Sequence, residues 1–172
     1  MISENIPGLY YFFVGEEIGR IGSSDLSQQF EQLIFNKKIP IINRCISFDR
    51  KGYDHVTTKQ HYRISCSFIF AHELSRQLNE FGFWYKPDDN GGRTDSAEFI
   101  DIIPECTNIS VGYFNEHTVK EKQDIEFLEL LSPFLIIISE AATDSSNGLY
   151  FSACLSKNAE DPSSILIFFK LK

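Results

Sequence analysis

Residues 10–35, YYFFVGEEIGRIGSSDLSQQFEQLIF, contain the pattern that decides the fold class. Residues 8–14 are an apolar run of strand length that ends at a glycine, which predicts a buried β-strand. Residues 23–35 have the spacing of an amphipathic helix, with Ser23 or Ser24 as the N-cap. The apolar face of that helix is made of Leu26, Phe30, Leu33 and Ile34. The stretch therefore predicts a strand, an acidic loop and a helix in succession.

The same alternation continues along the chain. Further strands are predicted at residues 39–49, 55–64, 83–86 and 106–114. Helices are predicted at residues 65–82, 94–103 and 119–131, and a loop at residues 87–92. The helix over 65–82 is the clearest, with an apolar stripe of Phe68, Ala71, Leu74 and Leu78 and a stop at Gly82. Strands that alternate with helices predict an α/β domain with a mostly parallel sheet flanked by helices.

The composition changes after about Leu131. Two strongly apolar runs follow, separated by polar, serine-rich sequence. These runs could be extra strands of the sheet, or they could belong to a tail foreign to the domain before it. The sequence therefore divides into residues 1–131, the α/β domain, and residues 132–172, a tail of unclear origin.

Charge and cysteine usage limit the partners and the compartment. The formal net charge is −8, which argues against nucleic acid and anionic lipid as general partners. No apolar run approaches the ~20 residues of a membrane span. The cysteines form no CxxC pair, so neither a zinc ribbon nor a redox motif is indicated. Reduced thiols in a chain of this size indicate a cytoplasmic protein.

Acidic residues or histidine follow several of the predicted strands. Glu16 and Glu17 follow the first strand, Asp49 ends the second, and His117 comes shortly after residues 106–114. Ligands of parallel α/β sheets gather at the carboxyl ends of the strands, and carboxylates and imidazoles are the ligands of hydrolytic zinc sites. The residues therefore predict a metal site at which one glutamate binds an ion and the other accepts a proton from an activated water.

The glycines around Glu16 and Glu17 bear on this interpretation. Neighbouring side chains on a strand point to opposite faces, so both glutamates reach one site only if the backbone turns there. Glycines on either side permit such a turn. The residues alone leave other interpretations open: the acidic pair can be a solvated loop, Asp49 can cap a turn, and His117 can be a surface residue.

Three segments together resemble a known family. They are VGEEIGRIGS at residues 14–23, ISFDRKG at residues 46–52 and TDSAEFIDIIPECTNISVGYFNEHTVKEKQDIEFLELL at residues 94–131. They resemble the carboxyl-terminal part of the catalytic domain of the di-zinc exopeptidases, the aminopeptidase and carboxypeptidase-like metallopeptidases. The resemblance covers residues 8–131 and implies a phosphorylase/hydrolase-like α/β fold.

The resemblance implies specific roles at the metal site. It makes Glu16 the general base, Glu17 a ligand of one zinc, Asp49 a ligand of the other zinc, and His117 the residue that completes the first zinc's set. The implied function is a zinc-dependent exopeptidase, aminopeptidase-like, that hydrolyses terminal peptide bonds by metal-activated water. The implied partner is a peptide or aminoacyl substrate, and a homo-oligomer is a further expectation.

Two more residues are implied on the substrate side. Asp95, in the GG-x-TD loop, would serve in substrate binding or behind the metal ligands. Tyr113, which precedes His117, would help to polarise the scissile carbonyl, as a tyrosine does in some members of the family.

The sequence also departs from the family pattern. Members carry a His-x-Asp motif and a metal-bridging aspartate before the glutamate pair, whereas only 15 residues precede Glu16 here and they contain neither His nor Asp. The resemblance thus implies a fold truncated at the N-terminus and an incomplete site. One alternative is a non-catalytic binding or interaction domain that keeps the fold without a full metal site. Another is a single ion held by Glu17, Asp49 and His117.

Overall fold

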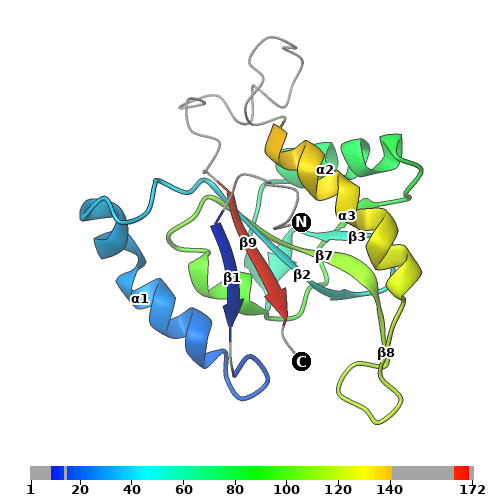
Figure 1. Cartoon of the computed structure of the whole chain (residues 1–172), viewed down its shortest axis with the longest axis horizontal. Coiled ribbons are helices and arrows are strands. Elements are labelled where there is room, and N and C mark those ends of the chain that lie inside the picture. The colour runs from blue at the N-terminus through cyan, green and yellow to red at the C-terminus, as the bar shows by residue number, and fades with distance from the viewer. Residues whose placement is uncertain (1–8, 14, 141–164, 171–172) are drawn as a thin grey trace.

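The computed structural model describes residues 9–13, 15–140 and 165–170, and Figure 1 shows the arrangement of their elements. The helices are α1 (Ile21–Phe35), α2 (Phe68–Glu80), the 3₁₀ helix η2 (Asp95–Phe99) and α3 (Ile125–Glu140). The strands are β1 (Leu9–Phe13), β2 (Arg44–Lys51), β3 (His55–Thr57), β4 (Lys59–Gln60), β5 (Arg63–Ile64), β6 (Lys86–Asp88), β7 (Glu105–Phe114), β8 (Lys122–Gln123) and β9 (Ile165–Lys170).

The main sheet has the strand order β1-β9-β2-β7-β3-β6, and β8 pairs with β7 outside this path. Strands β1, β9, β2 and β7 are parallel to one another, whereas β3 and β8 run antiparallel to β7. The α/β class is confirmed, and the sheet is mixed: most of the described pairings are parallel, whereas β3 and β8 are antiparallel to β7. The reason lies in residues 52–54, which connect β2 to β3, because a parallel connection needs about a dozen residues or more.

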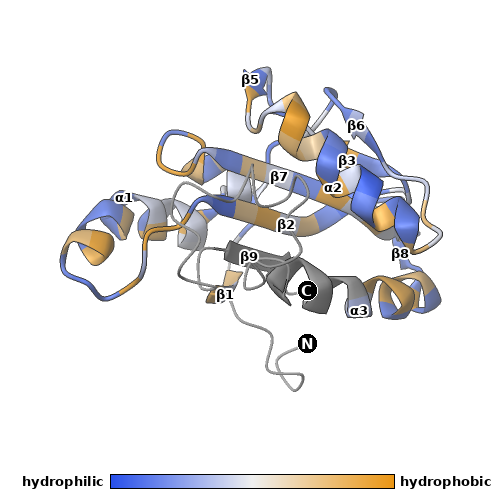
Figure 2. Ribbon diagram, turned by 90° about the horizontal axis from the view of Figure 1, so that it is seen from above, coloured by the Kyte–Doolittle hydropathy of each residue, from blue (hydrophilic) through white to orange (hydrophobic). Residues whose placement is uncertain are grey.

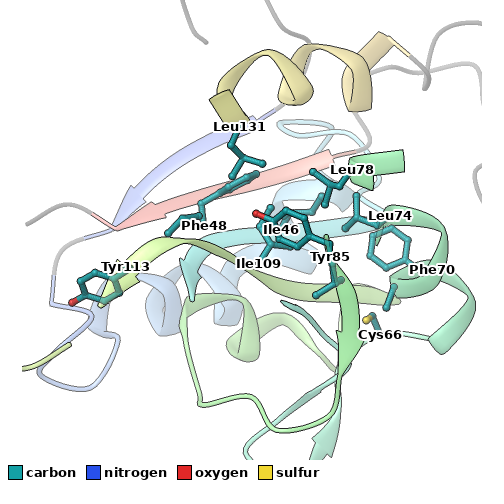
Figure 3. Close-up of a cluster of buried hydrophobic side chains, with 13 residues drawn as sticks. Ile46, Phe48, Cys66, Phe70, Leu74, Leu78, Tyr85, Ile109, Tyr113 and Leu131 are labelled. Atoms are coloured by element: carbon teal, nitrogen blue, oxygen red, sulfur yellow. The ribbon is translucent and has the colours of Figure 1, made fainter. Parts of the chain in front are cut away.

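Helices cover both faces of the sheet. Figure 2 shows α1 on one side of the strands and α2 and α3 on the other. Successive strand residues alternate between the two faces: Cys45 and Cys106 lie in the cluster under α1 and η2, and Ile46 and Ile109 in the cluster under α2 and α3. Figure 3 shows this second cluster, to which α3 contributes the fully buried Leu131, while Phe127 and Leu128 pack against it partly buried.

Helix α2 shows how local sequence produces this packing. The Ser67 hydroxyl accepts a hydrogen bond from the Phe70 amide and caps the helix. The buried face comprises Phe70, Ala71, Ser75, Leu74 and Leu78. The predicted stripe is therefore correct except at Phe68, which is exposed in the first turn while Phe70 fills the core. The helix ends just before Gly82, whose φ of 87° suits glycine.

Three other predicted elements differ from the structure. Residues 55–64 form β3, β4 and β5 instead of one strand, because His61 and Tyr62 adopt positive φ angles of 46° and 70° and reverse the chain. Of residues 83–86 only Lys86 belongs to a strand, β6. Residues 94–103 contain the single short helix η2.

The end of the chain is joined to the sheet. Helix α3 begins at Ile125, because β8 occupies part of the predicted helix, and it continues past Leu131 to Glu140. The boundary proposed at 131/132 therefore falls within α3. The first apolar run is helical, and of the second run residues 165–170 form β9, which lies between β1 and β2. Residues 8, 14 and 141–164, which include Cys154, lie outside the described residues. No helix in the described part is both long and apolar enough to cross a membrane.

Candidate functional site

A pocket of about 590 Å³ lies at the edge where the parallel strands β2 and β7 end. Four residues singled out from the sequence line it: Glu16, Asp49, Tyr113 and His117. They come from the loop after β1, from β2, from β7 and from the loop after β7. The shared direction of these strands brings their carboxyl ends to one edge of the sheet, which is why residues so far apart in the sequence meet there.

The glutamate pair lies in a tight turn at residues 16–19. The amides of Gly19 and Arg20 donate to the Glu16 carbonyl at 3.3 and 3.0 Å. Gly15 and Gly19 have φ angles of 74° and 111°, which glycine adopts without strain. The glycines therefore turn the backbone on both sides of the pair. Glu16 lines the pocket, whereas Glu17 is not among its lining residues and reaches it only through His117.

Glu17 and His117 are in direct contact. The Oε2 atom of Glu17 lies 2.9 Å from Nδ1 of His117, and the two side chains are 49% and 62% exposed. His117 has a positive φ of 62°, which is uncommon for a residue with a side chain. Its amide donates to Oε2 of Glu121 at 3.2 Å, and this bond helps to fix the loop. A carboxylate and an imidazole from distant segments thus form one pair of groups of the types that bind zinc.

Tyr113 also binds Glu121. Its hydroxyl donates to Oε2 of Glu121 at 2.5 Å, so that one carboxylate connects Tyr113 to the backbone of His117. Sequence reasoning missed Glu121, and no motif marks it. The only signal is its position four residues after His117 in a loop that returns to β7 through β8.

Asp49 is directed into the pocket by an irregularity in β2. The register between β2 and β7 shifts between Phe48 and Arg50, and the Asp49 amide donates to Oδ1 of Asn108 at 3.1 Å. The hydroxyl of Thr94 donates to Oδ2 of Asp49 at 3.1 Å. Bulges of this kind redirect side chains next to functional sites. Asp49 is thus held by groups from β7 and from the loop before η2, although β2 itself continues to Lys51.

The resemblance implies that Asp95 serves in substrate binding or behind the metal ligands, and the structure places it outside the pocket lining. Asp95 is buried, with 4% exposure. Its Oδ1 accepts a hydrogen bond of 2.5 Å from Ser23. Burial raises the pKa of Asp95 and the nearby charge of Glu16 adds to this, while the Ser23 hydroxyl acts in the opposite direction. Ser23 therefore joins α1 to η2 and is not the N-cap, a position that Arg20 occupies.

Ion pairs surround the pocket. They are Arg50 with Asp88, Lys51 with Glu116 at 2.6 Å, and Arg93 with Glu98 at 3.0 Å. The hydrogen bond from Lys51 lowers the pKa of Glu116. The segment from Asp88 to Arg93 passes very close to β3 and β4. A Cβ on Gly91 would collide with the Thr57 side chain and the Lys59 carbonyl. Glycine at this position lets the loop close one side of the pocket.

The donor groups match a zinc site only in part. Glu17 and His117 supply two ligands of the right type in contact, but a catalytic zinc ordinarily has three protein ligands. Among the described residues, no group of three or more His, Cys, Asp or Glu side chains is arranged to hold a metal ion. Glu17, Asp49 and His117 are therefore not arranged as a three-ligand group among these residues, and the expectation that they hold one ion together stays a prediction.

Comparison with known proteins gives a likeness in fold. No family model matches the sequence, and no curated protein sequence matches it significantly. The structure is similar to the solved structure of PhTET1-12s, which is a dodecamer, with a TM-score of 0.53 and 21% sequence identity. The match covers 74% of this chain and 39% of that chain, so this chain spans less than half the length of PhTET1-12s. At this identity the two share an α/β fold.

Proposed function

We propose that this chain carries part of the site of a zinc-dependent exopeptidase, a hydrolase that acts on terminal peptide bonds. The contact between Glu17 and His117 at 2.9 Å, beside a pocket lined by Glu16 and Asp49, is the observation that carries the proposal. The resemblance of the sequence to the di-zinc exopeptidases and the fold shared with PhTET1-12s support it.

Each residue of the proposed site would have a separate role in the hydrolysis. Glu17 and His117 would hold the ion, whose chemistry when bound is to polarise a carbonyl group and to lower the pKa of water to about 7. The Glu16 carboxylate would accept a proton from the attacking water and deliver it to the departing amine. Asp49, held by Thr94, would face the second ion of the family pattern, and Tyr113 would position the His117 loop through Glu121.

A complete zinc site would need further metal ligands from outside the described residues. With only Glu17 and His117 in contact, we expect this chain to bind zinc weakly and to hydrolyse peptides slowly by itself. The test is zinc binding, measured by equilibrium dialysis, together with hydrolysis of aminoacyl and short peptide substrates, for the wild type, Glu16→Gln and His117→Ala. Glu16→Gln should keep the zinc and lose hydrolysis, whereas His117→Ala should lose zinc.

The matched control is His72→Ala, because His72 is an exposed histidine on α2 outside the pocket. It should behave as the wild type in both assays. Equal zinc affinity in the wild type and in His117→Ala would overturn the metal assignment. Hydrolysis that survives Glu16→Gln unchanged would overturn the role of Glu16.

A second candidate is a binding or interaction domain without catalysis. The lack of a three-ligand group among the described residues favours it. It predicts no hydrolysis in any variant and a folded state that is insensitive to chelators. By analogy with the PhTET1-12s dodecamer we also propose self-association, which sedimentation would test, and the buried thiols Cys45, Cys66 and Cys106 support a cytoplasmic location.

A further inference from the structure

A second pocket, of about 440 Å³, lies between the end of α2 and the first half of α3. Its lining includes Tyr53, Phe81, Phe83, Trp84 and Phe127, together with the carboxylate residue Asp54, and we name it the aromatic pocket. It shares no lining residue with the pocket of the proposed active site. A pocket of this size with an apolar lining and few polar groups has the properties of a ligand site.

Aromatic rings in the lining of the pocket meet at steep interplanar angles. The ring centroids of Tyr53 and Phe127 are 4.8 Å apart at an interplanar angle of 65°, and those of Phe83 and Phe127 are 5.5 Å apart at 79°. Rings that meet at steep angles can present more than one π-face to a single guest. The negative faces of such rings attract an ammonium group, and the attraction grows when the group leaves water.

Three aromatic side chains of the pocket are open to solvent, and Tyr53 is the least exposed of them at 42%. Trp84 is 85% exposed and Phe81 is 52% exposed. Leu130, on the α3 side of the pocket, is 63% exposed as well. A guest that covers these side chains would remove a continuous apolar surface from water, which is favourable at about 25 cal/mol per Å².

The lining of the aromatic pocket and the adjoining side of α3 carry negative charge, which Lys86 offsets at Asp54. Asp54 belongs to the lining, and Phe81 follows the carbonyl end of α2, which carries a partial negative charge. On α3, the exposed Glu126 and Glu129 precede Leu130 and Pro133 by four residues each and so share their side of the helix. None of the described lining residues is Lys or Arg.

Asp54 has cationic neighbours that a ligand could replace. Its carboxylate lies 3.0 Å from Nζ of Lys86 and 3.4 Å from Nε2 of His55. The Lys86 side chain is 62% exposed, and exposed ion pairs contribute only about 0–1 kcal/mol. An incoming ammonium group can therefore take the place of Lys86 at small cost.

From the ring geometry, the exposed apolar surface and the negative surroundings, we propose that the aromatic pocket binds an organic cation, an ammonium group that carries an alkyl chain. The rings enclose the ammonium head, Asp54 pairs with it, and the alkyl chain covers Trp84 and Leu130. This site is independent of the proposed peptidase function.

The experiment uses a reporter that the chain already contains. Trp84 is the single tryptophan, so the intrinsic fluorescence of the intact protein reports directly on the aromatic pocket. The probes are hexyltrimethylammonium, neutral N-hexylacetamide and anionic hexanesulfonate. We expect hexyltrimethylammonium to shift the Trp84 emission to shorter wavelength in a saturating titration, with an affinity about 3- to 10-fold above that of the amide and with the sulfonate weaker still.

Two variants of the aromatic pocket and one control variant test whether the probe binds there. Asp54→Asn should bring the affinity for hexyltrimethylammonium close to that for the amide, while Asp89→Asn, which alters an exposed aspartate paired with Lys59 outside the pocket, should change neither. Trp84→Ala, measured by calorimetry, should abolish binding without unfolding the protein, because Trp84 is exposed.

Several results would overturn the proposal. They are an amide that binds as tightly as the ammonium probe, a lack of saturation with any probe, and unchanged selectivity in Asp54→Asn. An emission spectrum of the free protein that depends on protein concentration would show instead that a second copy of the chain occupies the pocket.

Discussion

At the scale of single residues, burial sets the behaviour of Asp95. Its carboxylate is 4% exposed and accepts the Ser23 hydroxyl at 2.5 Å. Burial raises its pKa in the folded state above the ordinary value of about 3.9. Folding therefore favours the protonated form. The stability that this preference contributes is present below about pH 4 and is lost as the pH rises through the raised folded-state pKa.

Asp95→Asn should reveal this dependence. Asparagine does not ionise and still offers an oxygen to Ser23, so the free energy of unfolding of the variant relative to the wild type should increase as the pH rises above about 4. Urea unfolding of both proteins across that range measures the difference. A difference that stays constant with pH would show that Asp95 does not titrate with a raised pKa.

At the scale of elements, β7 and α3 meet at a glycine. Gly112 has a φ of 75°, and a Cβ at this position would lie 3.1 Å from Cβ of Asp124 and 3.1 Å from Cδ1 of Phe127. The amide of Asp124 donates to the Gly112 carbonyl at 2.8 Å. The absence of a side chain at Gly112 therefore lets the start of α3 pack directly on the strand.

Gly112→Ala should destabilise the fold, by about 2–4 kcal/mol in the free energy of unfolding, because backbone strain and overpacking add. Gly52→Ala is the matched control. Gly52 has a similar φ of 78°, but the nearest atom to its added Cβ, Oγ of Ser110, is 3.9 Å away. The control should lose about 1 kcal/mol from strain alone. Equal losses in urea unfolding of the two variants would contradict the packing argument.

At the scale of the whole molecule, β9 lies between β1 and β2 and joins them into one sheet. It pairs with β1 on one side and with β2 on the other, so it connects the first strand of the chain to the centre of the fold. Ile167 pairs with Tyr10 and with Ile46 in these two ladders. The loop after β1 carries Glu16 and Glu17, and its position therefore depends on a strand from the other end of the chain.

Ile167→Pro should weaken both the fold and the site. Proline removes a donor and fits poorly in a central strand, and we expect a loss of about 2–4 kcal/mol in stability. Ile167→Val keeps the strand and should lose about 1 kcal/mol at most. Unfolding curves of the two variants that coincide would show that β9 does not hold the sheet together.

The sequence predicts the elements whose signals are local. The periodicity and the glycine stop of α2, the helix α1 and the strand β7 are confirmed, because their signals lie in neighbouring residues. The strand predicted at residues 39–49 is confirmed in part, since β2 begins at Arg44 and ends at Lys51. The direction of β3 and the place of β9 depend on contacts between distant segments, and no local pattern records them. The cap predicted at Ser23 or Ser24 is wrong because α1 begins at Ile21, which places both serines inside the helix.

The candidate site, like the fold, could be predicted where general rules apply and not where it depends on contacts between distant segments. The strand-end argument places Glu16, Asp49, Tyr113 and His117 around one pocket, because parallel strands bring their carboxyl ends together. Asp95 is buried and bonds to Ser23, and Tyr113 bonds to Glu121 although it lines the pocket. Tertiary packing brings these partners together, so no local pattern predicts them. The aromatic pocket has no sequence signature, because residues 53–54, residues 81–84 and α3 assemble it from separate segments.

The most direct test of the central claim is a double-mutant cycle on zinc affinity, measured by calorimetry for the wild type, Glu17→Gln, His117→Ala and the double variant. If both side chains hold the same ion, each single change should lower the affinity by about 10- to 100-fold or more, and the double change should add little further. Single changes that leave zinc affinity unaltered, or that act independently and add in full, would contradict it.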